Sequence, residues 1–239
     1  MSNKTLTFTE LSKVILDFAC SGRSVLFTGA GVGKKVGFPL WGEYLDHLAS
    51  VCAKYDDEDS ATLMRKKIRE SNLLGAAAIY EDCQDIPIGE RWKHLAAPFT
   101  AAVSEENLDL FAPLCGLPFG AIITTNYDRS QHDACARVKK RAPIQLELDG
   151  NTMRGGADQT AFYIARIHGA AESPTSVVLY PSAYKDLARN QVYEDFLLNL
   201  LRDRPCLFVG FSFLDPAIEN VLSTYKDKAR EMFKRASKK

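Results

Sequence analysis

The stretch FTGAGVGKKVGFPLW, which runs from Phe27 to Trp41, follows the apolar run SVLF and carries glycines at three alternate positions. Glycines after a buried strand are typical of nucleotide-binding loops, because backbone amides can approach a phosphate where no side chain intervenes. The stretch is open to four interpretations. It could be an ATPase-type phosphate loop, a dehydrogenase-type dinucleotide turn, another kind of nucleotide cradle, or a turn that only joins a strand to a helix.

The first two interpretations fit the spacing poorly. An ATPase-type loop needs four residues between its first glycine and the Gly-Lys-Ser/Thr group, but only three residues separate Gly29 from Gly33, and Lys35 stands where the hydroxyl residue belongs. A dehydrogenase turn needs Gly-x-Gly-x-x-Gly and then an acidic residue at the end of the next strand. Here Lys34 takes the place of the third glycine, and the segment that follows is predicted to be helical.

Composition narrows the class of protein. The chain has 239 residues, 46% of them hydrophobic, and a formal net charge of zero. It can therefore bury a large core, and no overall field attracts it to nucleic acid or membranes, which we do not expect as partners. The first residues, MSNKTLTFTE, lack the apolar core of a signal peptide. No two of the six cysteines lie within four residues of each other, so zinc-knuckle spacing is absent. We expect a cytoplasmic protein with reduced, mostly buried thiols.

Short apolar runs alternate with helical patterns along the chain. We predict strands in SVLFTG, GAIITTN, IQLEL, FYIARIH, SVVLY and CLFVGFS, and a helix whose start is capped by TFTE. This alternation predicts an α/β fold, a Rossmann-like parallel sheet with helices on both faces. Residues 1–239 are predicted to form a single domain with a helical insert at about 55–118. Because ligands bind at the carboxyl ends of such strands, TGAG, TTNYD, HG and GFS should meet at one site.

Four motifs at these strand ends decide between the interpretations. GAGVGKKVGFPLW, TTNYD, RIHG and VGFSFLDP occur in this order, and together they resemble the sirtuin-like fold. The resemblance is greatest to the zinc-free sirtuin-like domains of bacterial anti-phage defence proteins, and it spans about residues 24–219. It implies that the glycine loop binds NAD, through Gly29, Ala30, Gly31, Pro39 and Trp41. Trp41 would form an apolar wall near the nicotinamide, although it could also be an ordinary core residue.

The resemblance also implies the residues of the reaction. Sirtuins break the bond between nicotinamide and ribose in NAD, through a cation-like sugar similar to that of glycoside hydrolysis. Asn126 would hold the ribose or a water molecule, and His168 would be the general base. Asp128 would bind the nicotinamide carboxamide. An Asn-x-Asp sequence after a strand is also a good helix cap, and a histidine there is often only a buried polar residue.

Three further positions complete the implied site. Thr125 stands where deacylating sirtuins have glutamine, and Gly210 and Ser212 would face a phosphate or ribose. Asp215 is expected to cap the last helix, with Pro216 in its first position.

The departures from deacylating sirtuins point to simple hydrolysis. Only AAESPT separates His168-Gly169 from SVVLY, so the four-cysteine zinc module is missing, and Tyr180-Pro181-Ser182 replaces Phe-Gly-Glu. We predict an NAD hydrolase that yields nicotinamide and ADP-ribose, with a cyclised side product as a further outcome, and that uses no metal. In the proteins it resembles, such activity depletes NAD during anti-phage defence (abortive infection).

Two other functions stay open on the sequence alone. The chain could be an NAD-dependent protein deacylase or ADP-ribosyltransferase, or a non-catalytic module that senses NAD or ADP-ribose and controls assembly. Because uncontrolled NAD loss would kill the host, the resemblance implies gating by a homo-oligomer or by a separate regulatory partner, such as an ATPase or helicase.

Overall fold

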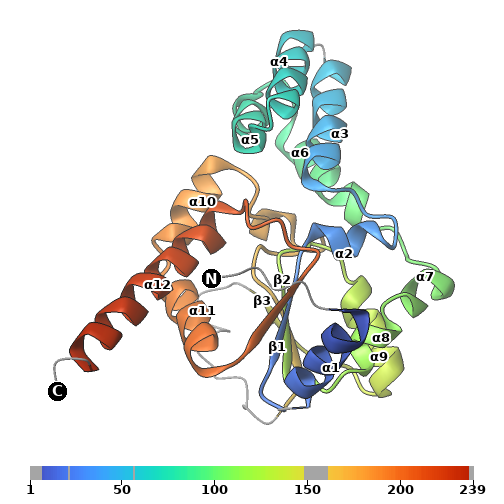
Figure 1. The fold of residues 1–239 in the computed structure, drawn as a ribbon. Coiled ribbons are helices and arrows are strands. Elements are labelled where there is room, and N and C mark those ends of the chain that lie inside the picture. Colours follow the sequence, from blue (N-terminus) through green and yellow to red (C-terminus); the bar gives the residue numbers. More distant parts are fainter. Residues whose placement is uncertain (1–6, 21, 56, 148–160, 237–239) are drawn as a thin grey trace.

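The computed structural model describes residues 7–20, 22–55, 57–147 and 161–236 (Figure 1). Within them, short parallel strands form a five-stranded sheet of order β3-β4-β2-β1-β5. The strands are β1 (Val25–Thr28), β2 (Ala121–Thr124), β3 (Ile144–Glu147), β4 (Tyr163–Arg166) and β5 (Cys206–Val209). The predicted Rossmann-like parallel sheet is therefore confirmed, although Leu148, the end of one predicted strand, lies outside the described residues.

Helices cover both faces of the sheet because successive side chains of a strand point to opposite sides. Leu26 and Ile122 belong to one core cluster, whereas Val25, Phe27 and Ile123 belong to the other. The first face packs against α1 (Phe8–Ala19), α8 (Ala112–Gly116) and α9 (Ser130–Lys139). The second packs against α10 (Pro181–Ala188), α11 (Gln191–Asp203) and α12 (Pro216–Ala236).

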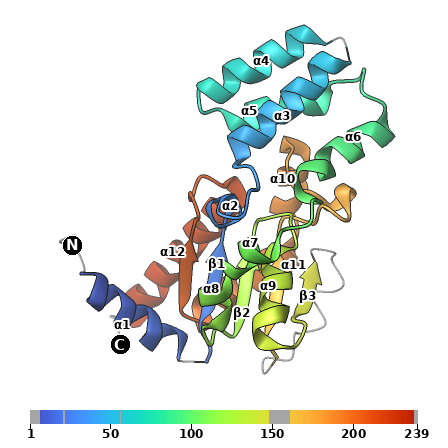
Figure 2. The ribbon, with the colours of Figure 1, turned by 90° about the vertical axis from the view of Figure 1, so that its right-hand side faces the viewer.

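A group of helices lies beyond the carboxyl ends of the strands (Figures 1 and 2). It contains α3 (Trp41–Lys54), α4 (Glu58–Arg69), α5 (Leu73–Asp82) and α6 (Ile88–Ala96). A turn of 3₁₀ helix (Ala97–Phe99) and α7 (Glu105–Asp109) lead back toward the sheet. The described part of 55–118 holds helices and no strand, as its pattern predicts, and its status as an insert within one domain stays a prediction.

Two local predictions about helix starts are confirmed. Thr7 caps α1 in a reciprocal arrangement with Glu10: the Glu10 amide donates to Thr7 Oγ1 at 3.2 Å, and the Thr7 amide donates to Glu10 Oε2 at 2.9 Å. Asp215 caps α12, because its Oδ1 accepts from the amides of Ala217 and Ile218 at 3.1 and 3.0 Å. Pro216 is the first residue of that helix.

The predicted strand in SVVLY is wrong. Residues 177–180 are buried but belong to no strand, and a short 3₁₀ helix (Pro174–Ser176) precedes them. The Val178 amide donates to the His168 carbonyl at 2.9 Å. The segment cannot join β4, because both edges of β4 are already paired, with β2 and with β3. Its apolar side chains fill the core from an irregular backbone instead.

The expectation of reduced thiols throughout is wrong for one pair. Cys115 of α8 and Cys135 of α9 are joined in a disulfide, whereas Cys20, Cys52, Cys83 and Cys206 are free. Their separation of 20 residues gave no sign of contact, because only the packing of α8 on α9 brings them together. No helix among the described residues combines the length and the apolar character that a membrane crossing needs.

Candidate active site

A cavity of about 590 Å³ lies at the carboxyl end of the sheet, between the strand ends and α3. Its volume falls in the range of about 300–1,000 Å³ that is usual for small-molecule sites. All of the residues proposed for the site from the sequence line this one cavity: Gly29, Ala30, Gly31, Pro39, Trp41, Thr125, Asn126, Asp128, His168, Gly210 and Ser212. The sequence motifs thus meet in space, while the role of each residue stays a prediction.

The glycine loops after β1 and β5 touch each other backbone to backbone. The Gly31 amide donates to the Gly210 carbonyl at 3.0 Å. A Cβ atom added to Gly29 or Gly31 would lie 2.7 or 2.9 Å from that same carbonyl oxygen. Gly210 itself has φ +61°, where other residues are strained, and a Cβ there would meet the Val32 amide at 2.6 Å. These glycines are therefore required by the protein's own packing.

The Asn126 side chain lies buried between the end of β2 and α2 (Ala30–Lys34). Its backbone amide donates to Thr124 Oγ1 at 3.1 Å, which fixes the turn after the strand. Its Nδ2 has no hydrogen-bond partner among the described residues. A buried amide without a partner is costly, so this atom is suited to donate to a ligand. Gly33 leaves room for it, since a Cβ there would lie 3.1 Å from Nδ2.

Asp128 is also buried beside Gly33, and it serves the start of α9. Its Oδ1 accepts from the Ser130 amide at 2.9 Å and from the Ser130 hydroxyl. Burial raises the pKa of this carboxyl above its ordinary value, although the serine hydrogen bonds act in the opposite direction. One oxygen of Asp128 therefore holds Ser130, the first residue of α9, while Asp128 as a whole still lines the cavity.

His168 follows β4 and is almost completely buried, with 3% of its side chain exposed. Its Nδ1 lies 3.4 Å from Asp215 Oδ2, and its Nε2 has no partner among the described residues. Burial lowers the pKa of the imidazole, against the opposing effect of the Asp215 charge, and so favours the neutral ring. A neutral imidazole with one unengaged nitrogen is the form that can accept a proton.

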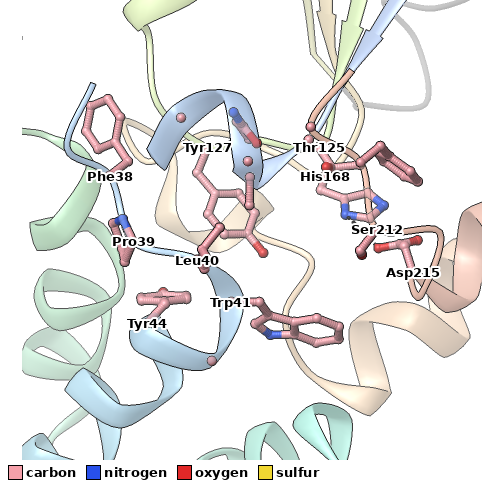
Figure 3. Close-up of a pocket in the computed structure, with 18 of the residues that line it drawn as sticks. Phe38, Pro39, Leu40, Trp41, Tyr44, Thr125, Tyr127, His168, Ser212 and Asp215 are labelled. Carbon is pink, nitrogen blue, oxygen red and sulfur yellow. Dashed lines mark ion pairs between the residues drawn. The ribbon is translucent and has the colours of Figure 1, made fainter. Parts of the chain in front are cut away.

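Asp215 and Tyr184 also line this cavity, although the sequence motifs predict neither of them there. The Tyr184 hydroxyl donates to Asp215 Oδ2 at 2.9 Å, and its ring meets the His168 ring edge-on. Figure 3 shows His168, Ser212 and Asp215 grouped on one side of the cavity. The Asp-Pro pair in the sequence predicts a helix cap, which accounts for Oδ1 of Asp215 but gives no indication that Oδ2 faces Tyr184 and His168. Only the packing of α10 against α12 brings Tyr184 to it.

The opposite side of the cavity is aromatic. Figure 3 shows Phe38 and Tyr44 on this side, away from His168. Trp41, at the start of α3, lies 6.3 Å from Tyr184 between ring centroids and packs against both core clusters, so it is a core residue and a cavity wall at once. None of the described residues that line the cavity is a lysine or arginine. Within the described ranges, no cluster of three or more His, Cys, Asp or Glu side chains could hold a metal ion.

Comparison with known proteins finds a matching family model. Residues 120–237 match the family model of the SIR2-like domain. The matched segment is just under half of the chain and contains Asn126, Asp128, His168, Gly210 and Ser212, whereas the glycine loop after β1 lies outside it. The sirtuin-like resemblance of the motifs is thus confirmed.

Curated relatives extend the similarity over most of the chain. Three proteins named NAD(+) hydrolase ThsA match: one from Bacillus cereus (strain MSX-D12) is 26% identical over 202 residues, which are 84% of this chain and 39% of the relative. One from Enterococcus faecium is 23% identical over 88% of this chain and 41% of the relative. One from Cytobacillus dafuensis is 25% identical over 89% and 40%. The chain therefore spans about two-fifths of the length of these relatives.

Proposed function

We propose that this chain hydrolyses NAD at the bond between nicotinamide and ribose, and releases nicotinamide and ADP-ribose. One observation carries the proposal: Asn126 Nδ2 and His168 Nε2 are buried polar atoms without partners among the described residues, and both side chains line one cavity. Buried polar groups are normally paired, so two side chains that line one cavity and each carry an orphaned atom support the binding of a ligand there. The names of the ThsA relatives support NAD as that ligand.

The reaction assigns a task to each of these groups. As the carbon–nitrogen bond breaks, its electron pair leaves with nicotinamide and the ribose becomes cation-like. The Asn126 amide would donate to a ribose hydroxyl or hold the attacking water. The water oxygen then bonds to the ribose carbon, and His168 accepts the proton that the water loses. Asp128 would accept a hydrogen bond from the nicotinamide carboxamide.

The glycine loops would hold the phosphates of NAD. Because the described lining has no lysine or arginine, backbone amides must supply most of the positive potential around the pyrophosphate. The interlocked loops at Gly29, Gly31 and Gly210 keep side chains away from the pyrophosphate. The Gly29 and Gly31 amides already donate to the Val209 and Gly210 carbonyls, so other amides of these loops would face the phosphates.

We extend the proposal to NAD depletion in anti-phage defence (abortive infection), on the basis of the motif resemblance. Such an activity would take place in the cytoplasm, where NAD is abundant. It would be held in check by a homo-oligomer or by a separate regulatory partner, with an ATPase or helicase as one candidate.

The test is incubation of the purified chain with NAD and chromatography of the products. We expect Asn126→Ala and His168→Ala each to abolish nicotinamide release while circular dichroism and the melting temperature stay close to wild type. His47→Ala is the matched control, because His47 lies on α3 outside the cavity lining and should leave turnover unchanged. Normal turnover by both site variants would refute the assignment.

Two further measurements test the deacylase and the NAD-sensing alternatives. An acetylated lysine peptide that is deacetylated only in the presence of NAD would indicate a deacylase. Calorimetric binding of NAD with no nicotinamide release under any condition, including high protein concentration, would indicate a sensing module.

A further inference from the structure

We propose that Asp215 is a positioning residue for His168: together with Tyr184 it holds the Nδ1–H side of the ring toward α12 and leaves Nε2 as the nitrogen that accepts the proton. This inference rests on the proposed NAD hydrolysis for its catalytic meaning. The orientation of the ring can be tested without it.

The Asp215 carboxylate is held at both oxygens. Its Oδ1 accepts from the two amides at the start of α12, and its Oδ2 accepts from the Tyr184 hydroxyl at 2.9 Å. Only 13% of its side chain is exposed. The carboxylate therefore cannot rotate without losing the helix cap, and Oδ2 is fixed in place facing the His168 ring.

The protons available around Asp215 decide which nitrogen of His168 is protonated. A carboxylate only accepts hydrogen bonds, so the His168 nitrogen that faces it must carry a proton to form one. Burial, with help from the Asp215 charge, raises the pKa of Tyr184, so its hydroxyl keeps its own proton and donates it to Oδ2. Neutral imidazole has a single N–H, and placing it on Nδ1 leaves the Nε2 lone pair open. That is the nitrogen without a partner among the described residues.

The distance between His168 and Asp215 is long for a hydrogen bond. The Nδ1–Oδ2 separation of 3.4 Å is longer than the usual 2.9–3.0 Å of such a bond. Hydrogen bonds in unliganded catalytic sites are often long and shorten when substrate binds. Positive charge that forms on the ring during proton transfer would draw the ring toward the fixed carboxylate.

Asp215→Asn separates the two duties of this side chain. The asparagine carbonyl can still accept from the α12 amides, and asparagine is a good N-cap. Its NH₂ group then faces Nδ1, which must become the acceptor, so the ring proton moves to Nε2 and the base is lost. We expect kcat to fall on the order of 10²-fold or more, with the KM for NAD within about threefold of wild type. Asp57→Asn is the control, since Asp57 also caps a helix, α4, by accepting from the Ser60 amide, and lies outside the cavity lining.

A second measurement reports the ring directly. In protein labelled with ¹⁵N-histidine, the His168 signals can be assigned among the four histidines by their loss in His168→Gln. We expect the Nδ1–H form in wild type and the Nε2–H form in Asp215→Asn. Tyr184→Phe should keep the Nδ1–H form and lower kcat about three- to tenfold, because one of the bonds to Oδ2 is lost.

The outcomes are distinct. The Nε2–H form in the wild type would overturn the inference, whether or not Asp215→Asn folds. If both proteins are folded, the same ring form in both would also overturn it. A switched ring proton with kcat within twofold of wild type would overturn its catalytic importance. If the wild type binds NAD and never releases nicotinamide, the proposed function fails, while the ring measurement still decides the orientation.

Discussion

Substitution of Gly33 by alanine should impair the site while leaving the fold intact. Gly33 lies inside helix α2, and a Cβ there would come within 3.1 Å of Asn126 Nδ2 and 3.6 Å of Asp128 Oδ2. Both neighbours are ends of side chains, so they can yield by a few tenths of an ångström. Alanine also favours a helix over glycine by about 0.8–1.0 kcal/mol. The gain in helix propensity and the strain from the close Cβ contact should be of similar size, so we expect the free energy of unfolding to stay within about 1 kcal/mol of wild type.

The loss should appear in catalysis. A misplacement of about 1 Å in a catalytic group can cost about 10²-fold in rate, so a shift of a few tenths should lower kcat/KM for NAD by roughly three- to thirtyfold. Nicotinamide release measured by chromatography and unfolding in urea would give both quantities. Gly89→Ala is the control, because Gly89 also lies in a helix and an added Cβ there meets nothing within 4 Å. Equal activity of the two variants would refute a role for the Asn126 position.

Gly210, His168 and Asp128 each give a further prediction. Gly210→Ala should lower the free energy of unfolding by about 2 kcal/mol or more in urea titration, because φ is +61° and the Cβ would meet the Val32 amide; an unchanged midpoint would contradict the interlocked loops. Burial lowers the pKa of His168, so the imidazole stays neutral at pH values somewhat below the ordinary histidine pKa of about 6.5. We therefore expect kcat/KM to decline on the acid side only below about pH 6.5. A decline centred above that pH would argue against His168 as the base. Asp128→Asn should raise the KM for NAD about tenfold or more in steady-state assays, since a charge-assisted hydrogen bond is lost; an unchanged KM would remove Asp128 from ligand binding.

The sheet and the place of the site could be predicted because both depend on local patterns. Continuous apolar runs such as those ending at Thr28 and Thr124 are buried on both faces, and polar residues directly after parallel strands must gather at one edge. The SVVLY run has the same composition, but no sheet edge was left beside β4 for it to pair with. Pairing depends on strands elsewhere in the chain, which no local pattern reveals.

The missed parts of the site have a similar cause. Tyr184 looks like an ordinary apolar-face residue of α10, and Asp215 looks like a cap. Their joint action on His168 depends on three elements that are far apart in the sequence. The disulfide between Cys115 and Cys135 was missed for the same reason.

The contact between the two glycine loops has a consequence for how tightly a nucleotide can be held. Because the Gly31 amide is already tied to the Gly210 carbonyl, the backbone around the cavity is ordered before anything enters. When a ligand binds there, the protein loses little conformational entropy, because its loops are already ordered. The flexibility of the ligand itself then becomes the main entropic cost of association. Stiff analogues of the substrate should therefore gain more from their rigidity here than in a site that must first assemble.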